Sequence, residues 1–457
     1  MDRTSASRRE TLFRLDGRPP IGAAVSMALQ HLVAMIVGCV TPAIIVANTV
    51  GLGQEDRVLL IQASLVASAV STLLQLYPIA GRFGSGLPVI MGISFAYVPS
   101  MQAAASAGGV SAIAGAMVVG GAVALLVGIF VRQIRTLFPP VITGTVIFTI
   151  GLSLYPTAIN YMAGGSGNTY DLVVTQQGLP EALVYGSWQN WLVAAVTLAA
   201  VLALNHYTRG FCKMASILLG MAVGYAVALC FGMVDFSGVA SSGWAAAPEV
   251  LPFGMTFDLA SCVSIGLLFA VNSIQAIGDF TATTVGGLGR EPTDRELQGG
   301  ILCYGATNIL CAFFGGLPTA TYSQNVGIVT VNRVINRSVF VLASGILLVA
   351  GLMPKFASLL TTIPQSVIGG ATISVFAAIT MTGIRMITQG GFTPRKSAVM
   401  GLSVAMGVGI TQVSGCLSGA GFPGWVNTVF GSSSVVVATI MAIVLNLIIP
   451  KEEEAQK

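Results

Sequence analysis

The sequence predicts an all-α polytopic membrane protein with 14 transmembrane spans in a 7+7 inverted repeat, and three observations lead to this fold class. Hydrophobic residues make up 54% of the 457 residues and charged residues only 8%, and the apolar runs have about the 17 to 25 residues that cross a bilayer. Nearly all basic residues fall on one side of the predicted spans. Two short patterns recur in both halves of the chain at similar offsets.

Apolar runs separated by loop signals define the spans. The first run follows a basic N-terminal segment without a cleavage signal, so we expect it to remain as the first span. The polar stretch at roughly 160–190 is rich in Gly and is expected to be an external loop. In order, the predicted spans are 21–48, 57–78, 86–107, 109–131, 138–157, 189–206, 212–233, 259–284, 298–314, 317–335, 338–353, 362–384, 396–415 and 430–449.

Charge tests this count independently, because one extra or missing span would invert the side of every later loop. With a cytoplasmic N-terminus, all but two of the 21 Lys and Arg residues fall on the inner side. The two exceptions are Arg57 and Lys355. This positive-inside bias predicts a multi-pass protein of the cytoplasmic (inner) membrane with both termini in the cytoplasm.

The recurring patterns indicate an internal repeat. Gly86-Leu87-Pro88 returns as Gly316-Leu317-Pro318 at an offset of 230, and a Pro-x-x-(Ile/Val)-x-Gly pattern occurs at 139–144 and 364–369 at an offset of 225. Together they divide the chain into seven spans plus seven. An odd-numbered repeat enters the membrane with opposite polarity, so the two halves should meet near the midplane.

The tenth predicted span is expected to be a broken helix. The stretch from Gly315 to Arg333 is mostly apolar but contains Pro318, three glycines and the polar run Ser323-Gln324-Asn325. Non-helical backbone is tolerated in hydrocarbon only where it is buried in protein or lines a cavity, so Ser323, Gln324 and Asn325 are candidate ligand-binding residues. The alternative is a kinked helix whose polar groups bond to neighbouring helices.

The third span is expected to contain the matching break. The offset of 230 sets Ser94 opposite Gln324 and Phe95 opposite Asn325. Ser94, Phe95 and Tyr97 are therefore further candidates for ligand binding, with the two aromatic rings able to stack on a planar molecule. Aromatic side chains in a membrane core can equally serve only for packing.

Polar residues also occur within the eighth and first spans. Asp279 is the one acidic residue well inside a predicted span, and helical spacing places Asn272, Gln275 and Asp279 on one face. An ionisable group at this depth points to a functional cavity, although Asp279 could instead pair with a backbone amide and Gln275 could join helices. His31, next to Gln30, could carry a proton or serve as a hydrogen-bonded packing group.

These motifs resemble those of the nucleobase/ascorbate transporters, also called the xanthine/uracil permease or nucleobase:cation symporter-2 family. Gln324-Asn325-x-Gly327 followed by Arg333 resembles the family signature. The run from Gln275 to Thr283 resembles its eighth span, and Gln30-His31 its first. The resemblance extends, in order, over essentially the whole chain.

The resemblance implies a domain organisation. It implies a core domain formed by 21–131 and 259–353, a gate domain formed by 132–258 and 354–450, and cytoplasmic tails at 1–20 and 451–457. The core is expected to hold the substrate and to move against the gate, often within a homodimer. Spans 3 and 10 are expected to carry short antiparallel strands next to half-helices.

The resemblance also implies a function. The Gln-Asn form of the signature is similar to that of the purine branch, which implies a cation-coupled (proton-coupled) secondary transporter of xanthine or uric acid. A carboxamide such as Gln324 offers a donor and an acceptor in one plane, which matches the C=O and N–H groups on a purine edge. The alternatives are a carrier of uracil or another nucleobase, or an anion transporter of the same fold with weak or no proton coupling.

Three positions depart from the purine members of the family. Those members usually have Glu where this chain has Gln275, Asp where it has Tyr304, and Thr where it has Asn332. A neutral amide carries no proton at physiological pH, so Asp279 takes over coupling, coupling is weak, or the ion differs. The polar network expected to govern coupling therefore comprises Asp279, His31, Asn272 and Tyr304.

Other classes of protein fit less well. An anion carrier needs a positive centre, but no Arg or Lys lies deep in the predicted core spans. An intramembrane enzyme is not expected, because the chain has no HExxH or GxSxG motif and its two histidines lie in different helices. We expect no cofactor, no metal site and no nucleic-acid partner. The expected partners are a small-molecule nucleobase, a proton or sodium ion, membrane lipid and a second copy of the chain.

Overall fold

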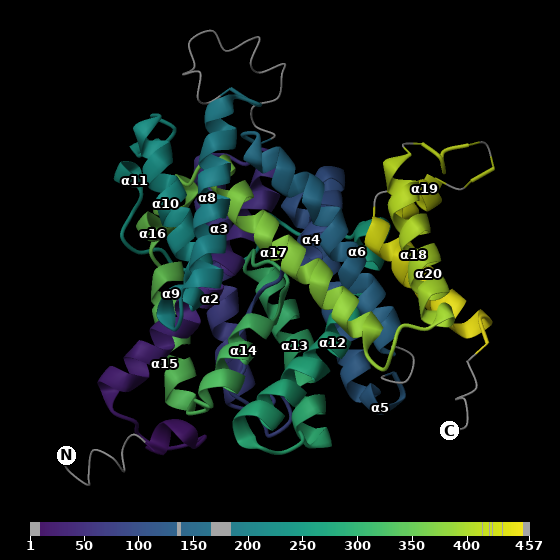
Figure 1. Ribbon diagram of the computed structural model, residues 1–457, viewed down its shortest axis with the longest axis horizontal. Coiled ribbons are helices and arrows are strands. Elements are labelled where there is room, and N and C mark those ends of the chain that lie inside the picture. Colours follow the sequence, from purple (N-terminus) through teal and green to yellow (C-terminus); the bar gives the residue numbers. More distant parts are fainter. Residues whose placement is uncertain are drawn as a thin grey trace.

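The computed structural model describes residues 10–134, 139–165, 184–413, 415–419, 421–422, 424–431 and 433–450. Within these residues, seven helices are long and apolar enough to cross a bilayer, and a pair of helices bent by 81° supplies an eighth. Most helices lie side by side around two short strands (Figure 1). The mainly helical membrane fold predicted from composition is confirmed.

The first half of the chain follows the predicted order of spans. The positions of its helices agree with the predicted apolar runs to within a few residues. Its elements are η1 (Thr11–Phe13), α2 (Ile21–Val50), α3 (Gln54–Leu76), β1 (Met91–Ile93), η2 (Phe95–Tyr97), α4 (Val98–Ile129), α5 (Val131–Ile134), α6 (Pro140–Met162), α8 (Trp188–Tyr207), α9 (Phe211–Met214), α10 (Ser216–Cys230) and α11 (Ser237–Ser241).

The second half repeats this pattern with a long helix, a helix, a strand and a half-helix. Its elements are α12 (Leu259–Thr283), η6 (Thr284–Leu288), α13 (Asp294–Phe313), β2 (Thr319–Thr321), α14 (Ser323–Asn332), α15 (Arg337–Gly351), α16 (Pro354–Thr361), α17 (Gln365–Thr388), α18 (Pro394–Gln412), α19 (Gly424–Phe430) and α20 (Ser434–Ile448). In Figure 1, α18 and α20 stand beside α6 at the right-hand edge.

Some predictions lie outside the described residues. They concern residues 1–9 of the predicted N-terminal tail, Arg135 of the charge count, residues 166–183 of the predicted external loop and the predicted C-terminal tail 451–457.

One boundary differs from the prediction. The predicted spans 86–107 and 109–131 are joined within α4 at Gly108 and Gly109, without an intervening loop. Gly109 has φ 72°, a conformation that glycine adopts without strain, so the chain reverses there in two residues.

The two predicted interruptions are confirmed, and they meet as an antiparallel pair. Met91 pairs with Thr321, Gly92 with Ala320 and Ile93 with Thr319. Met91 and Thr321 are 230 residues apart, which is the offset of the sequence repeat. One hydrogen bond extends the pairing at each end, from Ser94 N to Pro318 O (3.1 Å) and from Tyr322 N to Ile90 O (3.0 Å).

Side chains from the adjacent helices satisfy backbone groups of both strands. The Thr72 hydroxyl on α3 accepts from Met91 N (2.9 Å) and donates to Met91 O (3.1 Å). The Asn308 carboxamide on α13 accepts from Thr319 N (2.8 Å) and donates to Thr319 O (3.2 Å). Because an unpaired backbone group is costly away from water, these two residues make a strand crossing tolerable inside a membrane.

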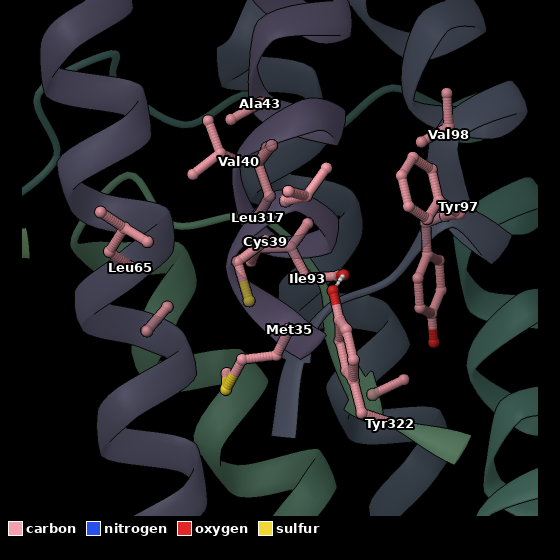
Figure 2. Close-up of a cluster of buried hydrophobic side chains, with 14 of the residues drawn as sticks. Met35, Cys39, Val40, Ala43, Leu65, Ile93, Tyr97, Val98, Leu317 and Tyr322 are labelled. Atoms are coloured by element: carbon pink, nitrogen blue, oxygen red, sulfur yellow. Dashed lines mark hydrogen bonds between the residues drawn. The ribbon is translucent and has the colours of Figure 1, made fainter. Parts of the chain in front are cut away.

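An apolar cluster surrounds the strand crossing (Figure 2). Met35, Cys39 and Val40 of α2 belong to this cluster together with Tyr322, whose hydroxyl donates to Ile93 O at 2.6 Å. Gly92 lies where no larger residue fits, because a Cβ atom there would be 2.6 Å from Cε2 of Tyr322 and 2.8 Å from Sγ of Cys39. The crossing is therefore fixed by packing as well as by hydrogen bonds.

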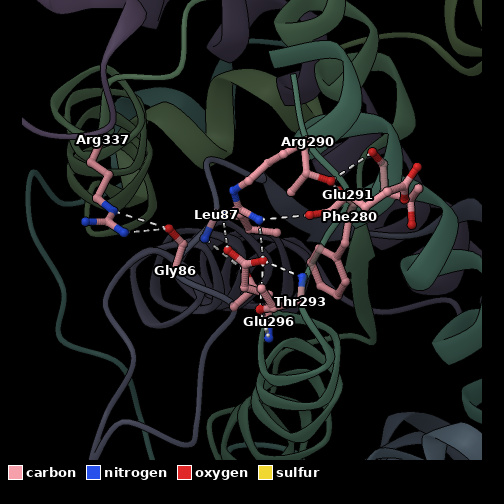
Figure 3. Close-up of polar contacts among 11 residues, drawn as sticks. Gly86, Leu87, Phe280, Arg290, Glu291, Thr293, Glu296 and Arg337 are labelled. Atoms are coloured by element: carbon pink, nitrogen blue, oxygen red, sulfur yellow. Dashed lines mark hydrogen bonds and ion pairs between the residues drawn. The ribbon is translucent and has the colours of Figure 1, made fainter. Parts of the chain in front are cut away.

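Polar contacts hold the end of the molecule that is predicted to be cytoplasmic (Figure 3). Arg337 at the start of α15 donates to Gly86 O (2.7 Å), in the segment leading to β1, and to the Asp16 carboxylate (2.8 Å). Arg290 pairs with Glu296 at 2.5 Å, and Glu296 also forms a capping box with Thr293 at the start of α13. Arg337 thus joins the N-terminal segment to the approach to β1, while the Arg290–Glu296–Thr293 contacts fix the start of α13.

Replacing Gly92 with Ala is expected to destabilise the protein. The added methyl group would lie too close to the Tyr322 ring and to Sγ of Cys39, so both side chains would have to shift. Overpacking of this kind lowers the free energy of unfolding by about 1–3 kcal/mol. Thermal unfolding of the purified protein in detergent measures this loss. Gly345→Ala on α15 is the matched control, because a Cβ there meets nothing within 4 Å. Equal midpoints for Gly92→Ala and the wild type would contradict the proposed constraint.

Candidate functional site

A cavity of about 300 Å³ lies where the two strands give way to η2 and α14. Five predicted ligand-binding residues line it together: Ser94, Phe95, Gln275, Ser323 and Gln324. The other lining residues are Ile93, Ala96, Ile147, Ile150, Thr321, Tyr322, Val375, Ala378, Ile379 and Thr382. The lining residues include no Arg, Lys, Asp, Glu or His.

One wall of the cavity carries two carboxamides that are free to bind a ligand. Gln324 lies in the first turn of α14, and Gln275 lies on α12. Neither side chain forms a hydrogen bond within the described part of the chain. Ser94 caps η2 by accepting from Ala96 N at 3.2 Å, so this short turn is fixed beside the carboxamides. Each Gln offers both donors and an acceptor to whatever occupies the cavity.

The opposite wall is apolar and comes from α6 and α17. Ile147 and Ile150 project from α6, and Val375, Ala378 and Ile379 from α17. The sequence analysis did not identify this wall as part of the site. The shared Pro-x-x-(Ile/Val)-x-Gly pattern begins both helices and marks them as equivalent elements of the two halves, but it does not indicate that they line the site.

Phe95 closes one side of the cavity between these two walls. Its ring packs edge-on against Phe376 of α17, with 5.3 Å between the ring centroids. Phe95 therefore contributes both to the cavity lining and to the contact between the strand crossing and α17. A flat apolar surface facing two carboxamides favours a planar molecule with a polar edge.

Asp279 lies beside the cavity and does not line it. Its carboxylate accepts from the hydroxyl of Thr321 (2.5 Å) and from the hydroxyl of Ser323 (2.8 Å). The sequence analysis considered a backbone amide as its partner, whereas the structure shows two hydroxyls. Asp279 thus joins α12 to the end of β2 and the start of α14, and only 8% of its surface is exposed.

Asn325 faces α2 and lies outside the cavity lining. Its amide nitrogen donates to Nδ1 of His31 (3.1 Å) and to His31 O (3.0 Å). His31 is buried against Phe340, with 4.7 Å between ring centroids. About two helical turns further along α14, Asn332 donates to Oε1 of Gln30 at 3.3 Å. The Gln30-His31 pair therefore holds α14 against α2 in this structure.

Tyr97, Tyr304 and Asn272 are also buried away from the cavity lining. The hydroxyls of Tyr97 and Tyr304 are hydrogen-bonded to one another, and Phe269 packs 5.0 Å from Tyr97 and 5.3 Å from Tyr304. Asn272 donates to Leu268 O at 3.1 Å. Because Tyr97 points into this cluster, its ring is not placed to stack on a molecule in the cavity.

A second cavity of about 590 Å³ adjoins the first. Gln324, Val375 and Ala378 line both. The second cavity follows α14 past Gly327 to Lys213 of α9, which lies on the side predicted to be cytoplasmic. The candidate site therefore adjoins a space that extends toward one face of the molecule.

Comparisons with known proteins agree on a family and on a fold. The family model for xanthine/uracil permeases, described as "Permease family", matches residues 22–416. The uric acid permease PucK of Bacillus subtilis (strain 168) is 35% identical over 92% of this chain and 94% of its own length. The xanthine permease XanP of Escherichia coli (strain K12) is 30% identical over 97% of this chain and 96% of its own length.

The fold is also found in a solved structure with a distant sequence. The transmembrane domain of the cyanobacterial bicarbonate transporter BicA matches with a TM-score of 0.57 and 14% sequence identity, covering 93% of this chain and 97% of that one. At this identity the match shows the architecture alone.

Removing the Asp279 carboxylate is expected to destabilise the junction of α12, β2 and α14. Asp279→Ala leaves two hydroxyls without their acceptor, and a hydrogen bond to a charged group contributes about 1.5–3 kcal/mol. We expect a lower unfolding midpoint, with a smaller decrease for Asp279→Asn, which retains one acceptor oxygen. Asp258→Ala, which removes the N-cap of the same helix, is the control. A loss for Asp279→Ala no larger than that of the control would show that the junction does not depend on this carboxylate.

Proposed function

This chain belongs to the xanthine/uracil permease family, and from that membership we propose that it is a secondary active transporter of an oxidised purine. Xanthine and uric acid are the proposed substrates, carried across the cytoplasmic membrane by alternating access. The observation that carries the proposal is a pair of carboxamides, those of Gln275 and Gln324. Neither has a hydrogen-bond partner within the described residues, and both face an apolar wall across one cavity. The names of PucK and XanP support the same substrates.

The shape and chemistry of the cavity support a purine. Its volume of about 300 Å³ is at the lower end of the roughly 300–1,000 Å³ range of small-molecule pockets, so a bicyclic ring is an appropriate size. The ring would lie between Phe95 and the α6/α17 wall. Its C=O and N–H groups would face Gln275 and Gln324, which offer matching donors and acceptors.

The start of α14 supplies additional donors. The backbone N–H groups of the first turn of a helix have no partners within the helix, and the helix dipole favours negative charge there. Ser323 and Gln324 occupy this turn and line the cavity. The start of α14 therefore favours a ligand with partly negative carbonyl oxygens, such as xanthine or urate, over a positively charged ligand.

The movement of the transporter follows the two walls. We propose that the strand crossing and α12 belong to a substrate-holding core (21–131 and 259–353), whereas α6 and α17 belong to a gate (132–258 and 354–450). The cavity lies between them, so sliding one against the other would expose it to alternate faces. The second cavity, which adjoins the first and extends toward Lys213, would be the inner path of such a movement. A homodimer would anchor the gates during this movement.

Coupling to an ion would require a group other than Gln275. The Asp279 carboxylate is hydrogen-bonded to two residues that line the cavity, because it accepts from the hydroxyls of Thr321 and Ser323. Protonation would turn one oxygen of Asp279 into a donor, so the carboxyl group would accept less well from these two hydroxyls. We propose that proton coupling, if retained, acts through Asp279. The buried His31 is hydrogen-bonded to Asn325, and neither residue is among those that line the cavity.

Uptake of labelled xanthine, urate, guanine, adenine and uracil into cells, with and without a protonophore, tests the proposed substrates. We expect uptake of xanthine or urate and an at least tenfold lower efficiency for Gln324→Ala, because two lost hydrogen bonds contribute roughly 1–3 kcal/mol. Gln389→Ala at the exposed end of α17 is the control for the loss of a Gln. Normal uptake by Gln324→Ala would remove this residue from the proposed site.

Replacing Gln275 with Glu tests how this site differs from those of its relatives. The new carboxylate can gain and lose a proton, so uptake should become more dependent on external pH and more sensitive to a protonophore. Its negative charge should also shift preference from anionic urate toward neutral xanthine. pH profiles and competition between the two purines measure both effects. Profiles identical to those of the wild type would show that position 275 influences neither.

A further inference from the structure

A third cavity, of about 620 Å³, lies at the end of the molecule that is predicted to be external. It opens between α2 and α3 on one side and, on the other, the segment after α10 together with α11, α16 and the start of α17. Its apolar lining includes Ile44, Ala47 and Ile61. Its polar lining includes Asn48, Gln54, Glu55, Arg57, Asp235 and Gln365.

Arg57 is positioned in this cavity with donors to spare. Its Nε donates to Leu52 O at 2.7 Å, which fixes the guanidinium group, and the residue is half-buried. Its two terminal nitrogens have no hydrogen-bond or ion-pair partner within the described residues. A guanidinium group held in this way presents a planar set of N–H donors to an anion or a carbonyl edge.

The neighbouring carboxylates, Glu55 and Asp235, line the same cavity but form no ion pair with Arg57 within the described residues. Asp235 is engaged elsewhere, because its two oxygens accept from the backbone N–H and the hydroxyl of Ser237, each at 2.8 Å. Glu55 is exposed and forms no ion pair with Arg57. The terminal N–H donors of Arg57 therefore remain available in the cavity, where no carboxylate occupies them.

The position of Arg57 is unusual for this chain. Charge placement predicts two basic residues on the outer side, Arg57 and Lys355. The ammonium group of Lys355 lies over the ring of Trp244, 4.5 Å from its centroid. Of these two predicted outer cations, Arg57 is the one that lines a cavity.

The outer cavity borders contacts that join the proposed core to the proposed gate. Asn48, which lines the cavity, donates to the Tyr161 hydroxyl of α6 at 3.1 Å. Thr157 of α6 donates to Gln102 of α4 at 3.3 Å. In the movement proposed above, these contacts separate when the outer path opens, and the cavity then becomes continuous with the space between core and gate.

We propose that this cavity is the outer vestibule of the transporter and that Arg57 recruits anionic purines there before they reach Gln275 and Gln324. The inference rests on the proposed function. Urate is an anion near neutral pH and carries carbonyl acceptors, so the unpaired guanidinium donors suit it by charge and by geometry. The inner site has no charged lining residue, so charge selection and edge recognition occur at different places along the path.

Initial-rate uptake of urate and xanthine at mildly acidic pH, where urate is an anion and xanthine is neutral, tests this inference in cells. For Arg57→Gln we expect the KM for urate to rise about threefold to fivefold with unchanged kcat, and the KM for xanthine to stay constant. Arg57→Lys should retain most of the urate affinity. The increase in KM should shrink at high ionic strength, because salt screens an exposed charge.

Glu55→Gln is the matched control, because it removes a negative charge from the same cavity. Its KM for urate should fall or stay constant. An equal change for urate and xanthine in Arg57→Gln, no change for either, or a rise for Glu55→Gln would overturn the inference. KM is independent of the amount of protein in the membrane, so reduced expression of a variant does not obscure the result. If the wild type transports neither purine, the proposed function itself fails.

Discussion

The structure depends on one constraint: a backbone that leaves the helix inside a bilayer must find partners for its N–H and C=O groups. Here two three-residue strands provide partners for each other, and Thr72 and Asn308 provide more from the sides. Once the strands are paired, the half-helices that follow them begin at fixed places. The cavity exists because both half-helices start there, so the same pairing that satisfies the backbone also creates the space for a solute.

The parts of the fold that follow from local chemistry could be predicted from the sequence. Span positions were predictable because each crossing needs an apolar run of a given length, and the break at Pro318 because glycine, proline and amides disfavour a continuous helix. The phase of α14 was not predictable. Gln324 and Asn325 are adjacent, but one turns toward the cavity and the other toward His31.

The apolar wall of the cavity was missed for a related physical reason. The wall residues Ile147, Ile150 and Val375 are aliphatic, like residues that face lipid or pack between helices. Hydropathy therefore does not distinguish residues that line the cavity from those in the other two settings. Only the three-dimensional arrangement of α6 and α17 reveals that they face the strand crossing. Tyr97 illustrates the opposite error, because it follows the strand closely in sequence but its hydroxyl is bonded to Tyr304, behind the cavity.

The strand crossing also has a consequence for how the protein is made. A ribosome completes β1 more than two hundred residues before β2 emerges, so the first strand must wait in the membrane without its partner. Thr72 precedes β1 in the chain and is hydrogen-bonded to both the N–H and the C=O of Met91. It can therefore satisfy these two backbone groups before β2 is synthesised. Asn308 likewise precedes β2. Each half thus carries, ahead of its strand, a side chain that bonds to the N–H and C=O of one strand residue, so each strand has a partner that does not depend on the other half.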